Sequence, residues 1–161
     1  PSTGDMSYGT KAITSNLVKH YNFYLNNYIL SGIILISTII FYKVFFYNYL
    51  SKIKYKNDEM FLAGGGIYAA TFLLNSNHDY RMVFLIFLIP LIVNLEDKVI
   101  RYIFFISIFL SIELHRLIYF LGFYGGIINT FFKIILFFLV SLILLDLFIK
   151  KFINNELFIK K

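Results

Sequence analysis

Two clusters of polar residues, far apart in the sequence, contain the side chains best suited to chemistry. Each cluster combines an acid, a histidine and an arginine in an otherwise apolar chain. Arginine binds phosphate oxygens through its planar fork of donors, and acids and histidines exchange protons. The clusters consist of His78, Asp79, Tyr80 and Arg81, and of Glu113, His115 and Arg116. The first is preceded by the polar residues 75–77.

Both clusters have a structural interpretation as well as a substrate-binding one, and the sequence leaves the choice open. Glu113 and Arg116 are three residues apart, so they share a helix face and can form an ion pair. Asp79 can cap a following helix, while Tyr80 and Arg81 are residue types that anchor helices at a membrane interface. Against this, a charged residue inside an apolar span is a candidate functional residue by default.

The composition indicates the environment of the elements that position these clusters. Of 161 residues, 59% are hydrophobic, 20% are aromatic and 15% are charged. Soluble domains have about 45–50% apolar and about 25% charged residues. A disordered chain is excluded, and a bilayer is the expected partner of the apolar surface. The net charge of +6 is attributed to topology-setting lysines, and no nucleic-acid partner is expected.

The apolar residues form five runs, which predict an all-α, polytopic integral membrane protein. The expected spans are 28–47, 60–74, 82–95, 99–121 and 127–149. Residues 1–27 form a polar external segment, and residues 150–161 form a basic cytoplasmic tail. Residues 11–24 fit either a surface amphipathic helix or a partly ordered loop. Pro90 is expected to kink the third span.

The distribution of lysine and arginine predicts the orientation. With the loop after the first span in the cytoplasm, ten cations lie on that side, against four outside, which are Lys11, Lys19, Arg81 and Arg116. The amino terminus is then external and the carboxyl terminus cytoplasmic, and a bacterial inner membrane is expected. A polar external segment of 27 residues favours a fragment of a longer polytopic protein.

Small residues in the second span predict close helix packing. Gly65 and Ala69, and Gly66 and Ala70, are four residues apart, a spacing that lets helix backbones approach one another in lipid. Metal binding is not expected, because His78 and His115 have no ligand partner at a suitable spacing on one helix. The chain has no cysteine, no nucleotide-binding motif and no hydrolase motif, and no cofactor is expected.

Three stretches resemble a known family. They are Asp58-Glu-Met-Phe-Leu-Ala-Gly-Gly-Gly66, Leu73-Leu-Asn-Ser-Asn-His-Asp-Tyr-Arg-Met-Val-Phe-Leu85 and Phe123-Tyr-Gly-Gly-Ile-Ile-Asn-Thr130. The chain is similar, over roughly residues 58–131, to the carboxyl-terminal part of polytopic bacterial membrane proteins related to glycosyltransferase family 87. In that family an N-x-D-Y-R-L-x-F-L-like string opens a span.

The resemblance implies a GT-C hexosyltransferase that uses a polyprenyl-phosphate-linked sugar. Its acidic catalytic residue lies in an early external loop, which places the catalytic base upstream of Pro1. For this chain, the resemblance implies a mainly scaffolding role. It implies that Arg81 contacts the donor phosphate and that Asp79 orients Arg81 or caps the helix. Two other classes stay open: a transporter or flippase segment with a polar path through Glu113, His115 and Arg116, and a non-catalytic membrane subunit. The oligomeric state is also open.

Overall fold

Helices are the only regular secondary structure in the part of the chain that the structure describes. The computed structural model describes residues 10–50, 52–53, 55, 58–74, 79–121 and 123–153. No strand occurs among these residues. The expected all-α fold class is therefore confirmed.

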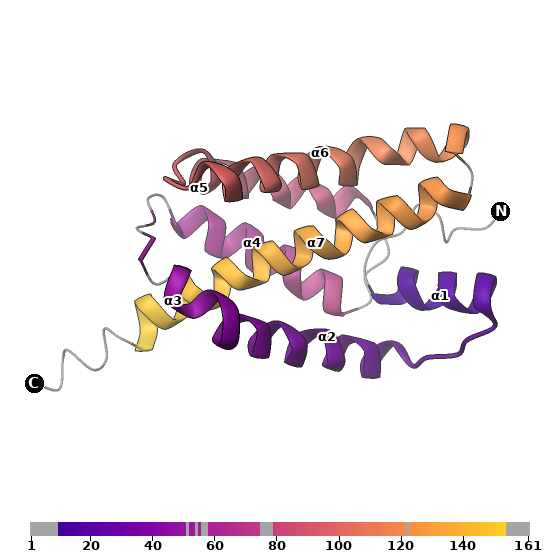
Figure 1. Ribbon diagram of the computed structural model, residues 1–161, viewed down its shortest axis with the longest axis horizontal. Coiled ribbons are helices and arrows are strands. Elements are labelled where there is room, and N and C mark those ends of the chain that lie inside the picture. Colours follow the sequence, from indigo (N-terminus) through magenta and orange to yellow (C-terminus); the bar gives the residue numbers. More distant parts are fainter. Residues whose placement is uncertain are drawn as a thin grey trace, which may run out of the picture.

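The helices follow one another with short connections (Figure 1). The first part of the chain contains α1 (Thr10–Tyr21), α2 (Asn27–Phe41), the π-helical turn η1 (Tyr42–Phe46), α3 (Tyr47–Leu50) and α4 (Asp58–Leu73). The second part contains the 3-10 helix η2 (Asp79–Leu88), α5 (Ile89–Val93), α6 (Lys98–Leu121), α7 (Phe123–Phe148) and the π-helical turn η3 (Ile149–Ile153). In Figure 1, α3 and α5 lie at one end of the molecule and α1 lies at the other.

Two of these helices are long and apolar enough to cross a membrane, among the residues described. They are the continuous helix Asn27–Leu50, which joins α2, η1 and α3, and Phe131–Lys151 within α7 and η3. The third apolar run contains a shorter apolar helix, Val83–Val93. Membrane crossing by any of the five predicted spans stays a prediction.

The core forms around α7, which packs against α6, α4 and α2. Large side chains from these helices are fully buried, and the rings of Phe72 and Phe137 stack with their centroids 4.4 Å apart. The most deeply buried members of this core are Phe61, Tyr68, Leu88, Ile92, Phe104, Leu136, Phe137 and Val140. The aromatic residues of α4 and α7 thus hold the centre of the bundle together.

Pro90 begins an α-helix where a kink was expected. The chain is a 3-10 helix up to Leu88, and α5 starts at Ile89 with Pro90 in its first turn. The first N–H groups of an α-helix have no intrahelical acceptor, so proline loses nothing at this position. The change of helix type at residues 88–89 thus replaces the expected kink.

The glycines of α4 allow close packing, and the predicted Gly65/Ala69 pair faces the core, with Gly65 buried and Ala69 packed against it. Gly64 and Gly65 are buried, and a Cβ atom on Gly64 would lie 2.4 Å from the Phe87 Cβ. Nothing described lies within 4 Å of the corresponding position on Gly66, and Ala70 is exposed. The Gly66/Ala70 pair is therefore wrong as a packing site within this chain, because it lies on the outer side of α4.

Residues 10–21 form a helix and residues 22–24 do not, while the position of this helix at a membrane surface stays a prediction. Hydroxyl and amide groups join α1 to α2, with Thr10 Oγ1 3.0 Å from Ser31 Oγ and Thr14 donating to Asn27. Ser31 Oγ lies 2.8 Å from the carbonyl oxygen of Leu73, at the end of α4. Polar contacts therefore hold α1, α2 and α4 together at this end of the bundle.

Candidate functional site

The structure places the backbone of Asp79–Arg81 and of Glu113–Arg116, but not their side chains. Asp79, Tyr80 and Arg81 form the first turn of η2, while 75–78 lie outside the described residues. Residues 113–116 belong to the carboxyl-terminal half of α6, and their side chains also lie outside the described part. In Figure 1 this half of α6 points away from the end that carries α3 and α5. The expected position of both clusters on the external side therefore stays a prediction.

The polar site with complete geometry lies at the opposite end and centres on Asp146 of α7. Its side chain is 1% exposed. Asp146 Oδ1 accepts a hydrogen bond of 2.9 Å from the Tyr42 hydroxyl. Asp146 Oδ2 lies 2.7 Å from the ammonium of Lys150, one helical turn away. A buried carboxylate needs such partners, because its desolvation otherwise costs several kcal/mol.

The ammonium of Lys150 also binds the chain segment that follows α2. Its Nζ donates to the carbonyl oxygens of Leu50 and Ile53, at 2.8 Å each. It also lies 4.6 Å from the centroid of the Tyr55 ring, within the range of a cation–π contact. Lys150 thus donates hydrogen bonds to the backbone at the end of α3 and in the loop that follows it. Carbonyl groups at the end of a helix lack an intrahelical donor.

Tyr55 completes this cluster from the loop before α4. Its hydroxyl is buried and has no hydrogen-bond partner among the described residues. Burial raises the pKa of the Tyr55 phenol, and the negative charge of Asp146 raises it further. Tyr55 therefore stays protonated and neutral at physiological pH.

Two further contacts surround the cluster at the same end. Lys151 and Asp58 form an ion pair at 3.4 Å with both side chains partly exposed. Asp97 accepts a hydrogen bond from the Tyr49 hydroxyl and caps α6 by accepting from the backbone N–H of Ile100 at 3.0 Å. These contacts join α3 to the start of α6, and α7 to the start of α4.

The sequence contained only part of the signal for this cluster. Asp146 and Lys150 have the i, i+4 spacing of a helical ion pair, which marks them as partners. Tyr42 is 104 residues away from Asp146, and no local pattern predicts that contact. The two π-helical turns, η1 and η3, each contribute one cluster residue, Tyr42 and Lys150. Turns of this kind often occur at functional sites.

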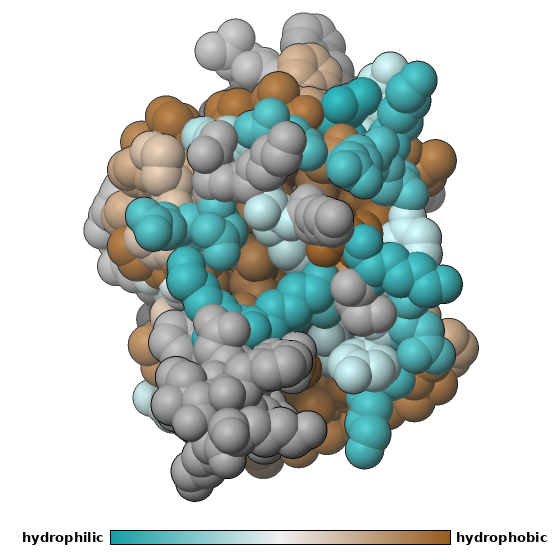
Figure 2. All heavy atoms as spheres, turned by 90° about the vertical axis from the view of Figure 1, so that its left-hand side faces the viewer, coloured by the Kyte–Doolittle hydropathy of each residue, from teal (hydrophilic) through white to brown (hydrophobic). Residues whose placement is uncertain are grey.

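The cluster is suited to holding segments together. The Asp146 carboxylate and the Lys150 ammonium join the end of α7 to η1, to α3 and to the loop that follows α3. Figure 2 shows the end of the molecule that carries this site, where hydrophilic residues cover much of the surface and hydrophobic residues lie around the edge.

Fold and site together define an all-helical protein with two helices apolar and long enough to cross a membrane, joined near one end by a buried polar cluster. No family model, curated protein or solved structure was found to match this chain.

Proposed function

We propose that this chain is an integral membrane protein unit whose helices cross a bilayer five times. The observation that carries the proposal is the exposed apolar surface of the helix Asn27–Leu50. Within its most apolar stretch, only 11% of the residues are buried. Exposed side chains cover it along its length, including Ile29, Ile33, Ile36, Ile40 and Phe45. Leaving such surface in water costs about 25 cal/mol per Å². A hydrocarbon environment removes that cost.

The remaining spans are proposed from helix length and position. At 1.5 Å per residue, α6 is about 36 Å long and α4 is about 24 Å long. The shorter segments, α4 and η2 with α5, pack against longer neighbours, so protein covers part of their surface. The end that carries α3 and α5 is assigned to the cytoplasm, because lysines and arginines are concentrated in its connections.

The orientation is tested by labelling single cysteines, because the chain has no native cysteine. Tyr24→Cys lies at the end with α1, and Glu96→Cys lies next to α5; both native side chains are exposed. An impermeant thiol reagent is expected to label position 24 in intact cells, and position 96 only after permeabilisation. The reverse pattern would invert the proposed topology. Labelling of both positions in intact cells would contradict membrane crossing between them.

For activity, we propose that the unit is the membrane-embedded part of a GT-C-like glycosyltransferase, acting mainly as scaffold. The support is the resemblance of residues 77–85 to the family string. Arg81, at the start of η2, is the proposed contact to the phosphate of a polyprenyl-linked sugar donor, with Asp79 and Tyr80 beside it. The alternative classes are a transporter segment using Glu113, His115 and Arg116, and a structural subunit.

Substitution of Arg81 in the full-length protein tests this activity. Arg81→Ala is expected to reduce lipid-linked sugar transfer by about 10- to 100-fold, the loss of a charge-assisted phosphate contact of roughly 1.5–3 kcal/mol. Arg81→Lys keeps the charge and is expected to recover only part of the rate, because lysine lacks the planar fork. Transfer at the unchanged rate in Arg81→Ala would contradict the phosphate contact. Loss of solute movement in Glu113→Gln, with no sugar transfer in any variant, would favour the transporter.

A further inference from the structure

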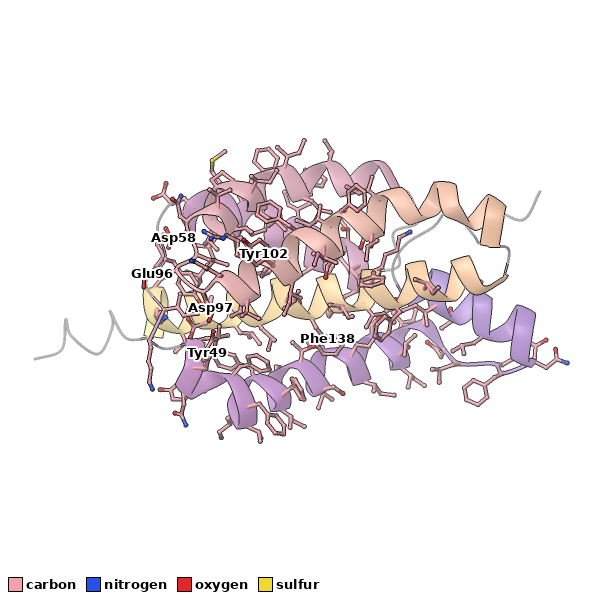
Figure 3. The ribbon with its side chains drawn as sticks, turned by 45° about the horizontal axis from the view of Figure 1, so that its top comes forward. Tyr49, Asp58, Glu96, Asp97, Tyr102 and Phe138 are labelled. Carbon is pink, nitrogen blue, oxygen red and sulfur yellow. The ribbon has the colours of Figure 1, made fainter. Side chains whose placement is uncertain are left out.

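We call the surface where α2 and α6 flank α7 (Figure 3) the seam. The helices α2 and α6 both pack against α7, but they make no extensive contact with each other. Phe138 of α7 lies between α7 and α2 in the view of Figure 3. Both flanking helices carry exposed apolar side chains, such as Phe45 of η1 and Tyr102 of α6. Both flanking helices thus present apolar side chains on their exposed surfaces.

One hydrogen bond crosses the seam at its charged end. The Tyr49 hydroxyl donates to Asp97, and these two side chains point toward one another in Figure 3. Two lysines lie close along the backbone to the residues that this bond joins. The backbone N–H of Lys52 bonds to the carbonyl oxygen of Tyr49 at 3.3 Å, and Lys98 directly follows Asp97. Both lysine side chains are exposed.

The nearby acids are largely engaged within the protein. Asp97 accepts from Tyr49 and from the amino end of α6, and Asp58 pairs with Lys151. Among the described residues, neither Lys52 nor Lys98 forms an ion pair with an acid. Glu96 is exposed beside them and offsets part of their charge. Two cations therefore remain available where the seam meets the aqueous phase.

We propose that an anionic phospholipid binds in this seam, with its phosphate between Lys52 and Lys98 and its acyl chains along the apolar surface between α2 and α6. Lysines at the cytoplasmic end of transmembrane helices attract anionic headgroups. Tyr49 and Tyr102 lie at the level where tyrosine prefers the membrane interface, and α7 forms the floor of the seam. The inference rests on the proposed membrane insertion and goes beyond it, because it names a lipid class and its binding residues.

The test is native mass spectrometry of the intact chain, purified in detergent and titrated with phosphatidylglycerol or phosphatidylcholine. One phosphatidylglycerol is expected to bind more tightly than phosphatidylcholine. Each lysine near an anionic headgroup contributes about a fivefold factor in affinity, so Lys52→Gln/Lys98→Gln is expected to weaken phosphatidylglycerol binding by about 25-fold. Phosphatidylcholine binding should change little.

Matched variants separate a site from general charge. Lys11→Gln/Lys19→Gln removes the same charge from α1, at the opposite end of the molecule, and should leave phosphatidylglycerol binding unchanged. Glu96→Gln should strengthen it. Equal losses in the two lysine pairs, or equal affinity for both lipids in the wild type, would overturn the proposal.

Two further measurements complete the test. Competition by inorganic phosphate as effective as that by the lipid would show a soluble-anion site and overturn lipid binding. Insertion into phosphatidylcholine vesicles is measured separately. Insertion without preference for phosphatidylglycerol contradicts only the lipid site, whereas failure to insert contradicts the proposed membrane function together with it.

Discussion

Replacing Lys150 with Met is expected to lower the free energy of unfolding by about 3 kcal/mol. The change leaves Asp146, which is 1% exposed, without its counter-charge, and it removes the Lys150 donor from the carbonyl oxygens of Leu50 and Ile53. Removing one partner of a buried ion pair costs about 3–5 kcal/mol. The lower end applies because the Lys150 side chain is 27% exposed. Reversible unfolding in mixed micelles measures the change.

Lys151→Met is the matched control for this prediction. It removes the same charge from the adjacent residue, whose ion pair with Asp58 is longer and more exposed. Such pairs contribute about 0–1 kcal/mol, so the variant should unfold nearly like the wild type. The double variant Asp146→Leu/Lys150→Met removes both buried charges and is expected to regain most of the lost stability. Equal effects of Lys150→Met and Lys151→Met would contradict a special role for the cluster.

Replacing Gly64 with Ala is expected to destabilise the protein by about 1–3 kcal/mol, the usual cost of overpacking a tight interface. The added Cβ would lie 2.4 Å from the Phe87 Cβ and 2.9 Å from the carbonyl oxygen of Phe84. The Phe84 oxygen is backbone, so a rotamer change cannot relieve its contact. Relief requires η2 to move away from α4. The same unfolding measurement detects the loss.

Gly66→Ala is the matched control on the same helix. Nothing described lies within 4 Å of the added atom, and alanine has the higher helix propensity by about 1 kcal/mol. Gly66→Ala should therefore leave stability unchanged or raise it slightly. A larger loss in Gly66→Ala than in Gly64→Ala would show that an outer partner, and not η2, requires the glycines.

Much of the secondary structure was predictable because it depends on local patterns. Long apolar runs can form only helices if lipid surrounds them, since each backbone group must find its partner within the segment. This is why the helices observed at residues 27–50 and 98–121 follow the apolar runs closely. The change from 3-10 helix to α-helix before Pro90 was not predictable, because it depends on how η2 packs against α4 through the glycines.

The candidate sites also differ in how far local sequence patterns predict them. Asp79–Arg81 and Glu113–Arg116 were found because charges are conspicuous in an apolar sequence, and their function stays a prediction. The cluster around Asp146 was not predicted as a site. Asp146 and Lys150 occur at a common helical spacing, and Tyr42 and Tyr55 are two of thirteen tyrosines. Nothing local distinguishes these two from the others.

The sequence alone determined the all-helical class and the position of the long apolar helices, because hydrophobicity and backbone hydrogen bonding act within each segment. Only the tertiary structure decided which glycines meet a neighbouring helix and which polar residues meet at Asp146. Those contacts join residues up to 104 positions apart, and they depend on the angles at which whole helices pack against α7. Burial then makes the pairing necessary, because a carboxylate removed from solvent is stable only beside a cation and a hydrogen-bond donor.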